Sequence, residues 1–172
     1  MKAPDVADQG LFLAEEFILW LWMQGLTTGG LSGRPDDKSA CFVDDHMVLA
    51  SERGDVKILT LAKGNPAESR EAFEAMSRGM RPVNAKVRIL AGDMEWVFTL
   101  AASGLQVSGA KLPPTQSKDM AGRFADRMFL IEELQSHLDR RFAHFLGIRI
   151  SEPAALEAQL KDWIKQGLGV AA

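Results

Sequence analysis

The strongest constraint on the fold is a pair of segments in which apolar side chains recur at every second residue. In residues 83–90 the apolar positions alternate with polar ones, and after Gly92-Asp93 the alternation resumes in residues 96–100. Successive side chains of a strand point to opposite faces of a sheet, so each segment has one apolar and one polar face. The sequence therefore predicts an antiparallel hairpin with one face on a core and the other in solvent.

Further strand patterns surround this hairpin. Residues 41–49 suit two strands joined by a tight turn at Asp44-Asp45-His46, or one interrupted strand, and residues 56–61 suit another strand. Between them and the hairpin, Pro66 begins a short amphipathic helix that we expect to end near Gly79.

Helical patterns stand at both ends of the sequence. Apolar residues crowd around most of the segment 11–23, which predicts a buried helix, and Glu15-Glu16 interrupts a run that is too short to cross a bilayer. From Ser117 apolar residues recur every three or four positions, which indicates a long helix lying across the sheet. A last helix follows Ser151-Glu152-Pro153.

We therefore expect a single α+β domain, an antiparallel sheet with a long helix and additional helices packed on it. Within residues 1–172 we predict a flexible N-terminus (1–8), an apolar helix (9–25), a sheet with a short helix (40–112) and C-terminal helices (115–168). The segment 25–38 collects Gly, Ser, Thr, Pro and Asp, which is typical of a mobile loop.

Charge and cysteine content narrow the function classes. The net charge of −3 does not favour phosphate backbones as a basic domain would, so any nucleic-acid contact must use a local basic patch. The single cysteine, Cys41, has no partner in the chain, which favours a cytoplasmic location. Its apolar neighbours predict a buried structural thiol.

No signature of catalysis or metal binding stands out. Ser103 and Ser108 lack the glycine context of a nucleophile elbow. His137 and His144 are two helical turns apart, roughly 10 Å, which is too far for one metal ion, so we expect a partly exposed pair of histidines. We expect no enzyme, no metal and no cofactor, although a site assembled from dispersed Asp, Glu and His residues stays open.

Basic residues concentrate between Lys57 and Arg88, and Lys86 shares the polar face of a predicted strand with Arg88. Such a face can contact phosphates without reading base sequence. The alternative is a solvated strand face balanced by nearby carboxylates. The tryptophans at 20, 22 and 96 stand at apolar positions, where we expect core packing rather than base stacking.

Several stretches together resemble a known family. They are a strand, a charged loop and short helix ending in Arg78-Gly79, a hairpin through Lys86-Val87-Arg88-Ile89 and Trp96-Val97-Phe98, the segment Ser108-Gly109-Ala110-Lys111-Leu112, and a helix containing Arg123-Phe124-Ala125-Asp126-Arg127. With the early Trp20-Leu21-Trp22 helix, this order resembles the C-terminal portion of RdgC, the recombination-associated protein family, over residues 15–147.

The resemblance implies a non-catalytic protein that binds double-stranded DNA without sequence specificity, forms a ring-shaped homodimer and restrains the RecA recombinase. By position, it implies DNA-binding roles for Lys57, Lys63, Arg81, Lys86 and Arg88. A second hypothesis is a protein-interaction or oligomerisation domain without DNA binding, in which the apolar first helix and the long helix supply the interface.

Overall fold

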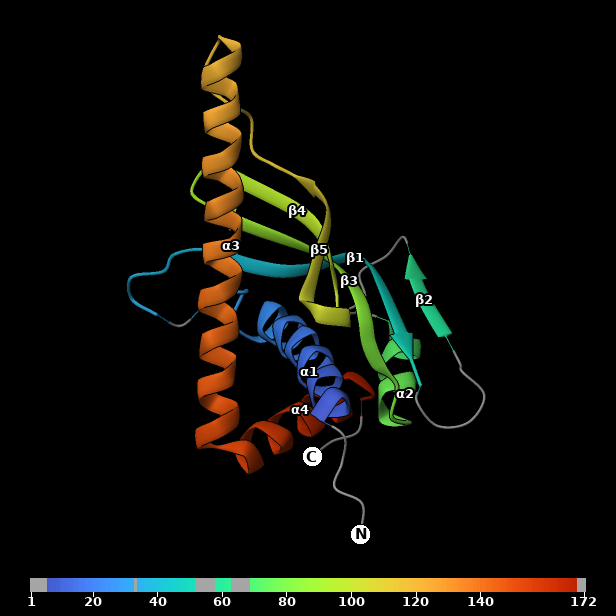
Figure 1. Ribbon diagram of the computed structural model, residues 1–172. Helices are drawn as coiled ribbons and strands as arrows, with labels where there is room; N and C mark the ends of the chain where they lie inside the picture. Colours follow the sequence, from blue (N-terminus) through green and yellow to red (C-terminus); the bar gives the residue numbers. More distant parts are fainter. Residues whose placement is uncertain (1–5, 33, 52–57, 63–68, 170–172) are drawn as a thin grey trace.

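The computed structural model describes residues 6–32, 34–51, 58–62 and 69–169, with side chains from Leu13 onward. Along the chain the elements are α1 (Val6–Thr27), β1 (Ala40–Ala50), β2 (Ile58–Ala62), α2 (Arg70–Ser77), β3 (Arg81–Ala91), β4 (Met94–Ala101), the 3-10 turn η2 (Ser103–Leu105), β5 (Gln106–Lys111), α3 (Met120–Ser151) and α4 (Pro153–Gly167). The strands form one antiparallel sheet in the order β2-β1-β3-β4-β5 (Figure 1). The predicted α+β class is confirmed.

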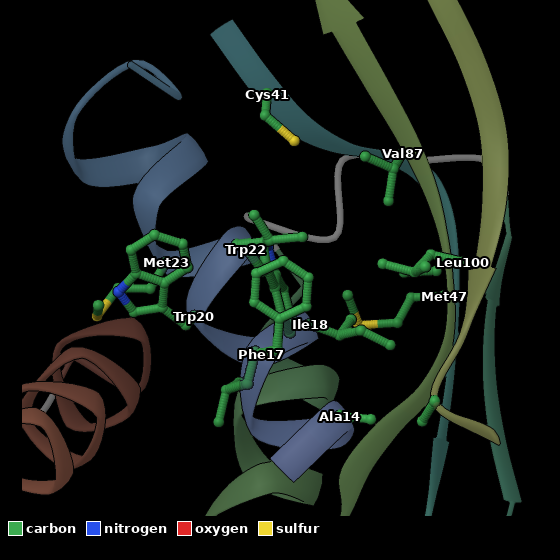
Figure 2. Packing of buried hydrophobic residues seen from close by; sticks show 14 of the residues in the cluster. Ala14, Phe17, Ile18, Trp20, Trp22, Met23, Cys41, Met47, Val87 and Leu100 are labelled. Carbon is green, nitrogen blue, oxygen red and sulfur yellow. The ribbon is translucent and has the colours of Figure 1, made fainter. Parts of the chain in front are cut away.

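Helix α1 is the centre of the core. Residues 17–23 are all buried, and Figure 2 shows side chains from this part of α1 facing Met47, Val87 and Leu100 of the sheet. On other sides of α1, Phe17 packs edge-on against Phe142 of α3, with ring centroids 5.0 Å apart. A helix that is apolar nearly all round needs partners on every side, and the sheet, α3 and α4 supply them. Helix α1 is longer than the predicted 9–25, and residues 6–8, predicted to be flexible, are helical.

The predicted hairpin is the β3–β4 pair. Val87 faces Phe98 in the register, and the alternate residues of β3 and β4 that point to the helices are buried. Gly92 turns the chain with φ +60°, a left-handed conformation that glycine adopts without strain. Lys86 and Arg88 therefore lie on the opposite, open face of the sheet.

Strand β1 is one interrupted strand and not a pair of strands. Val43 pairs with Val87 and Met47 with Ala85, so the three residues Asp44-Asp45-His46 stand opposite the single residue Lys86. This bulge breaks the alternation of side chains along β1 and places carboxylates at the open face.

The loop after α1, predicted to be mobile, is anchored at Gly30 and Ser39 by Arg141 of α3. Arg141 is buried and donates hydrogen bonds to the carbonyl oxygens of Gly30 (3.2 Å) and Ser39 (2.8 Å). Asp37 accepts from the Ser39 hydroxyl at 2.5 Å. Buried polar contacts thus hold a loop whose composition is typical of flexible loops, and composition alone does not reveal such contacts.

Cys41 is 1 % exposed, and burial raises the pKa of its thiol to about 11. The predicted burial of Cys41 is confirmed, and a thiol with so high a pKa is a poor nucleophile at neutral pH.

Candidate functional site

The five residues implied in DNA binding do not form one surface in the described part of the chain. Lys57 and Lys63 lie outside the described residues. Arg81 donates to the carbonyl oxygens of Met76 (3.4 Å) and Met80 (3.0 Å) and lines a depression with Glu15, Glu16 and α4, on the helix-covered side of the sheet. Only Lys86 and Arg88 come together, on the open face.

Lys86 and Arg88 belong to an ionic group that we call the open-face cluster, composed of Asp44, Asp45, Lys86, Arg88 and Glu95. Lys86 lies 2.9 Å from Asp45 and 3.5 Å from Asp44. Arg88 bridges Asp44 (3.0 Å) and Glu95 (2.6 Å). Three carboxylates surround two cations, so the cluster has a net negative charge.

These contacts set the protonation of the cluster. Partial burial works to raise the pKa of Asp44, but the hydrogen bond and charge of Arg88 and the charge of Lys86 outweigh it, and the pKa lies below its ordinary value. The hydrogen bond to Asp45 raises the pKa of Lys86. A phosphate would therefore have to displace carboxylates that already contact the two cations.

The most exposed apolar surface lies on the first three turns of α3, residues 120–131, which we call the free end of α3. Figure 1 shows these turns standing beyond the edge of the strands. Four side chains on one side of these turns form an exposed row: Met120 (88 % exposed), Phe124 (68 %), Met128 (44 %) and Ile131 (47 %).

The free end is a well-formed helix and not a frayed terminus. Asp119 caps it by accepting from the backbone N–H of Gly122 at 2.8 Å. Asp126 accepts from the backbone N–H groups of Gln116 and Ser117, at 3.1 and 2.9 Å, and so ties the incoming chain to the second turn. The exposed row is therefore presented on a rigid element.

The row leads into an apolar groove where α3 meets the body of the protein. The groove has a volume of about 350 Å³, and Ile131 and Leu138 of α3 form one wall, facing Leu105 and Val107. Phe17 of α1 lies in the same lining. Exposed row and groove together make one continuous apolar strip along α3.

Sequence reasoning assigned Met120, Phe124, Met128 and Ile131 to the face of α3 that packs on the sheet. Their spacing is indeed helical, but α3 has 32 residues, about 48 Å at 1.5 Å per residue. Five strands at about 4.8 Å spacing span only about half of that length. Comparing the length of the predicted helix with the width of the predicted sheet would therefore have indicated that the helix extends beyond the sheet.

The described residues include both histidines of α3, His137 and His144. Within the described residues, no group of three or more His, Cys, Asp or Glu side chains is placed to hold a metal ion. His137, predicted to be partly exposed, is buried against Trp96 with ring centroids 5.3 Å apart, and its Nδ1 lies 3.1 Å from Arg140. His144 packs on Trp20. None of the described helices is long and apolar enough to span a membrane.

Comparison with known proteins adds no relative: no family model matches the chain, and no curated protein matches it.

Proposed function

We propose that this chain is a non-catalytic interaction module that forms a homodimer through the free end of α3. The observation that carries this proposal is the exposed row of Met120, Phe124, Met128 and Ile131 on a capped, overhanging helix. Monomeric proteins rarely expose a contiguous apolar surface on this scale, and such surfaces mark sites of association.

A second copy of the chain is the partner that the row itself suits. Apolar residues repeated at intervals of three and four along a helix pack into the same pattern on another helix. The same surface on both subunits then gives a closed two-fold interface, which is the commonest form of oligomer. Burial of the row against its counterpart removes its apolar area from water, at about 25 cal/mol per Å².

Sedimentation velocity over a range of protein concentrations tests the proposal. The unaltered chain is expected to shift from monomer to dimer as concentration rises. Phe124→Asp is expected to weaken the dimer at least ten-fold, because a charge then replaces a large apolar side chain in both subunits. The matched control is Ile150→Asp, at an exposed position (78 %) near the other end of α3, which should leave the dimer intact.

A chain that stays monomeric at every concentration would overturn the proposal. Equal weakening by Phe124→Asp and Ile150→Asp would show that association does not use the free end.

Sequence-independent DNA binding is a second candidate, and one observation favours it at the free end of α3. Lys118 and Arg127 are exposed there, and neither forms an ion pair with any residue that the structure describes. Lys86 and Arg88, by contrast, are already paired. If the chain serves in the cytoplasm as a recombination-associated module, as the RdgC resemblance implies, its phosphate contacts are better sought around α3 than on the open sheet face.

A further inference from the structure

The spacing and charges of the free end point to a specific geometry for the dimer, an inference that rests on the proposed self-association. We propose that the two copies of α3 pack in parallel about a two-fold axis along the helices, with Arg127 of one copy paired to Glu132 of the other. This arrangement gives the chain a selective partner, a second copy in one orientation.

The apolar spacing fits two helices that pack along a common seam. Ala121, Phe124, Met128 and Ile131 follow at intervals of three, four and three, the alternation that keeps a coiled-coil seam on the partner. Met120 borders this seam. Leu130, which faces the core, is one residue from Ile131 and so about 100° away around the helix. The body of the protein therefore lies beside the seam, which is open at Ala121, Phe124 and Met128 and borders the groove at Ile131.

Charges on the two flanks of the seam select the parallel orientation. Arg127 and Glu132 are exposed, lie on opposite flanks and are five residues apart, the separation at which flanking residues of parallel helices meet across the seam. Neither residue forms an ion pair within the described part of the chain.

An antiparallel two-fold would bring each flank against the same flank of the other copy. Arg127 would then meet the flank that carries Arg127 of the other copy, and Glu132 the flank that carries Glu132, so neither would find an opposite charge. Charge complementarity thus favours the parallel pair.

The length of the seam predicts a weak dimer. The next two seam positions after Ile131 are Gln135, which is polar, and Leu138, which lines the groove against the body of the protein. The seam therefore covers about three turns, roughly 18 Å, and buries less than the about 800 Å² per partner of a standard interface. We expect a concentration-dependent equilibrium and not a permanent dimer.

Cysteine cross-linking tests the orientation directly. Phe124→Cys and Ile131→Cys are made separately, and each protein is treated at high concentration with copper–phenanthroline in air. Two thiols lose two protons and two electrons to the oxidant and form one disulfide, which requires Cβ atoms about 4 Å apart. In the parallel dimer both variants cross-link to themselves, because each residue meets its own counterpart.

The controls are Phe129→Cys, exposed at 55 % on a different side of α3, and the unaltered chain, whose only thiol is the buried Cys41. Neither is expected to cross-link. In an antiparallel dimer at most one of positions 124 and 131, about 10 Å apart along the helix, can lie near the two-fold axis. Cross-linking confined to one position, or to a mixture of the two variants, would overturn the parallel arrangement while leaving self-association standing. A chain that is monomeric in sedimentation would overturn both proposals.

Charge reversal tests the Arg127–Glu132 pairs. Arg127→Glu and Glu132→Arg, made singly, are each expected to raise the dissociation constant by roughly three- to ten-fold, because like charges then meet twice in the dimer. The double variant restores both pairs in a parallel dimer and should return to the original affinity. A double variant as weak as the two single variants combined would rule out this pairing.

Discussion

Helix α3 buries two side chains that carry or can acquire a positive charge, His137 and Arg141. Burial lowers the pKa of His137 below its ordinary value of 6.5, and the charge of Arg140 lowers it further, while Asp37 and Glu133 partly oppose the shift. Arg141 donates to the backbone of the loop after α1. His137 is a residue through which pH acts on stability, because its pKa is lowered in the folded chain.

The sign of that effect follows from proton binding. Between the folded-state pKa and 6.5 the unfolded chain binds the proton that folded His137 excludes, so the free energy of unfolding falls as pH drops through about 6.5. His46→Gln, at a partly exposed position, should keep the original pH dependence of the free energy of unfolding, measured by urea denaturation. The same pH dependence in His137→Gln would show that His137 is not the group responsible.

At the scale of elements, periodicity predicted most of the fold. Alternation located β3 and β4, three-four spacing located α3, and the apolar residues crowded into the segment 11–23 located α1. The connections between elements were less predictable, because contacts with residues distant in sequence hold them in place. The loop after α1 is held by Arg141, more than a hundred residues away, and the bulge in β1 is set by its register with β3.

The candidate site was predictable only in part, and for the same reason. The sequence placed Lys86 and Arg88 correctly on one strand face. It did not show that Asp44, Asp45 and Glu95 gather around them, since this depends on strand order and on the bulge. The overhang of α3 likewise becomes visible only when the length of α3 is compared with the width of the sheet.

The connection between α1 and β1 offers a matched pair of glycines. Gly30 has φ +73°, and a Cβ there would lie 2.3 Å from the carbonyl oxygen of Cys41, whereas Gly29, at φ +64°, has no described atom within 4 Å of such a Cβ. Gly29→Ala should cost about 1–2 kcal/mol from left-handed backbone alone. Gly30→Ala should cost several kcal/mol more, because the carbonyl it meets is fixed backbone. Equal losses in the free energy of unfolding, measured by urea denaturation, would mean that the loop moves to accommodate the methyl group of Gly30→Ala at no energetic cost.

For the whole molecule, the distribution of charge matters more than its total. The net charge of −3 opposes phosphate contact, and the open-face cluster adds no unpaired cation. Lys118 and Arg127 lie near the start of α3. In a parallel homodimer each Arg127 is paired with Glu132 of the other copy, so the two copies of Lys118 supply the unpaired positive charge at this end of the assembly.

Fluorescence anisotropy with labelled duplex DNA therefore distinguishes two surfaces. If the chain binds DNA, affinity should fall by orders of magnitude between about 50 and 200 mM salt and should not depend on base sequence, because each phosphate contact releases counterions. Lys118→Ala, which leaves the Arg127–Glu132 pairs of the dimer intact, should weaken binding equally on unrelated sequences and flatten the salt dependence. Lys86→Ala with Arg88→Ala, on the open face, should change it little, since both cations already satisfy carboxylates. The reverse ranking would return DNA binding to the sheet face, and no binding at 50 mM salt would leave self-association as the function of this surface.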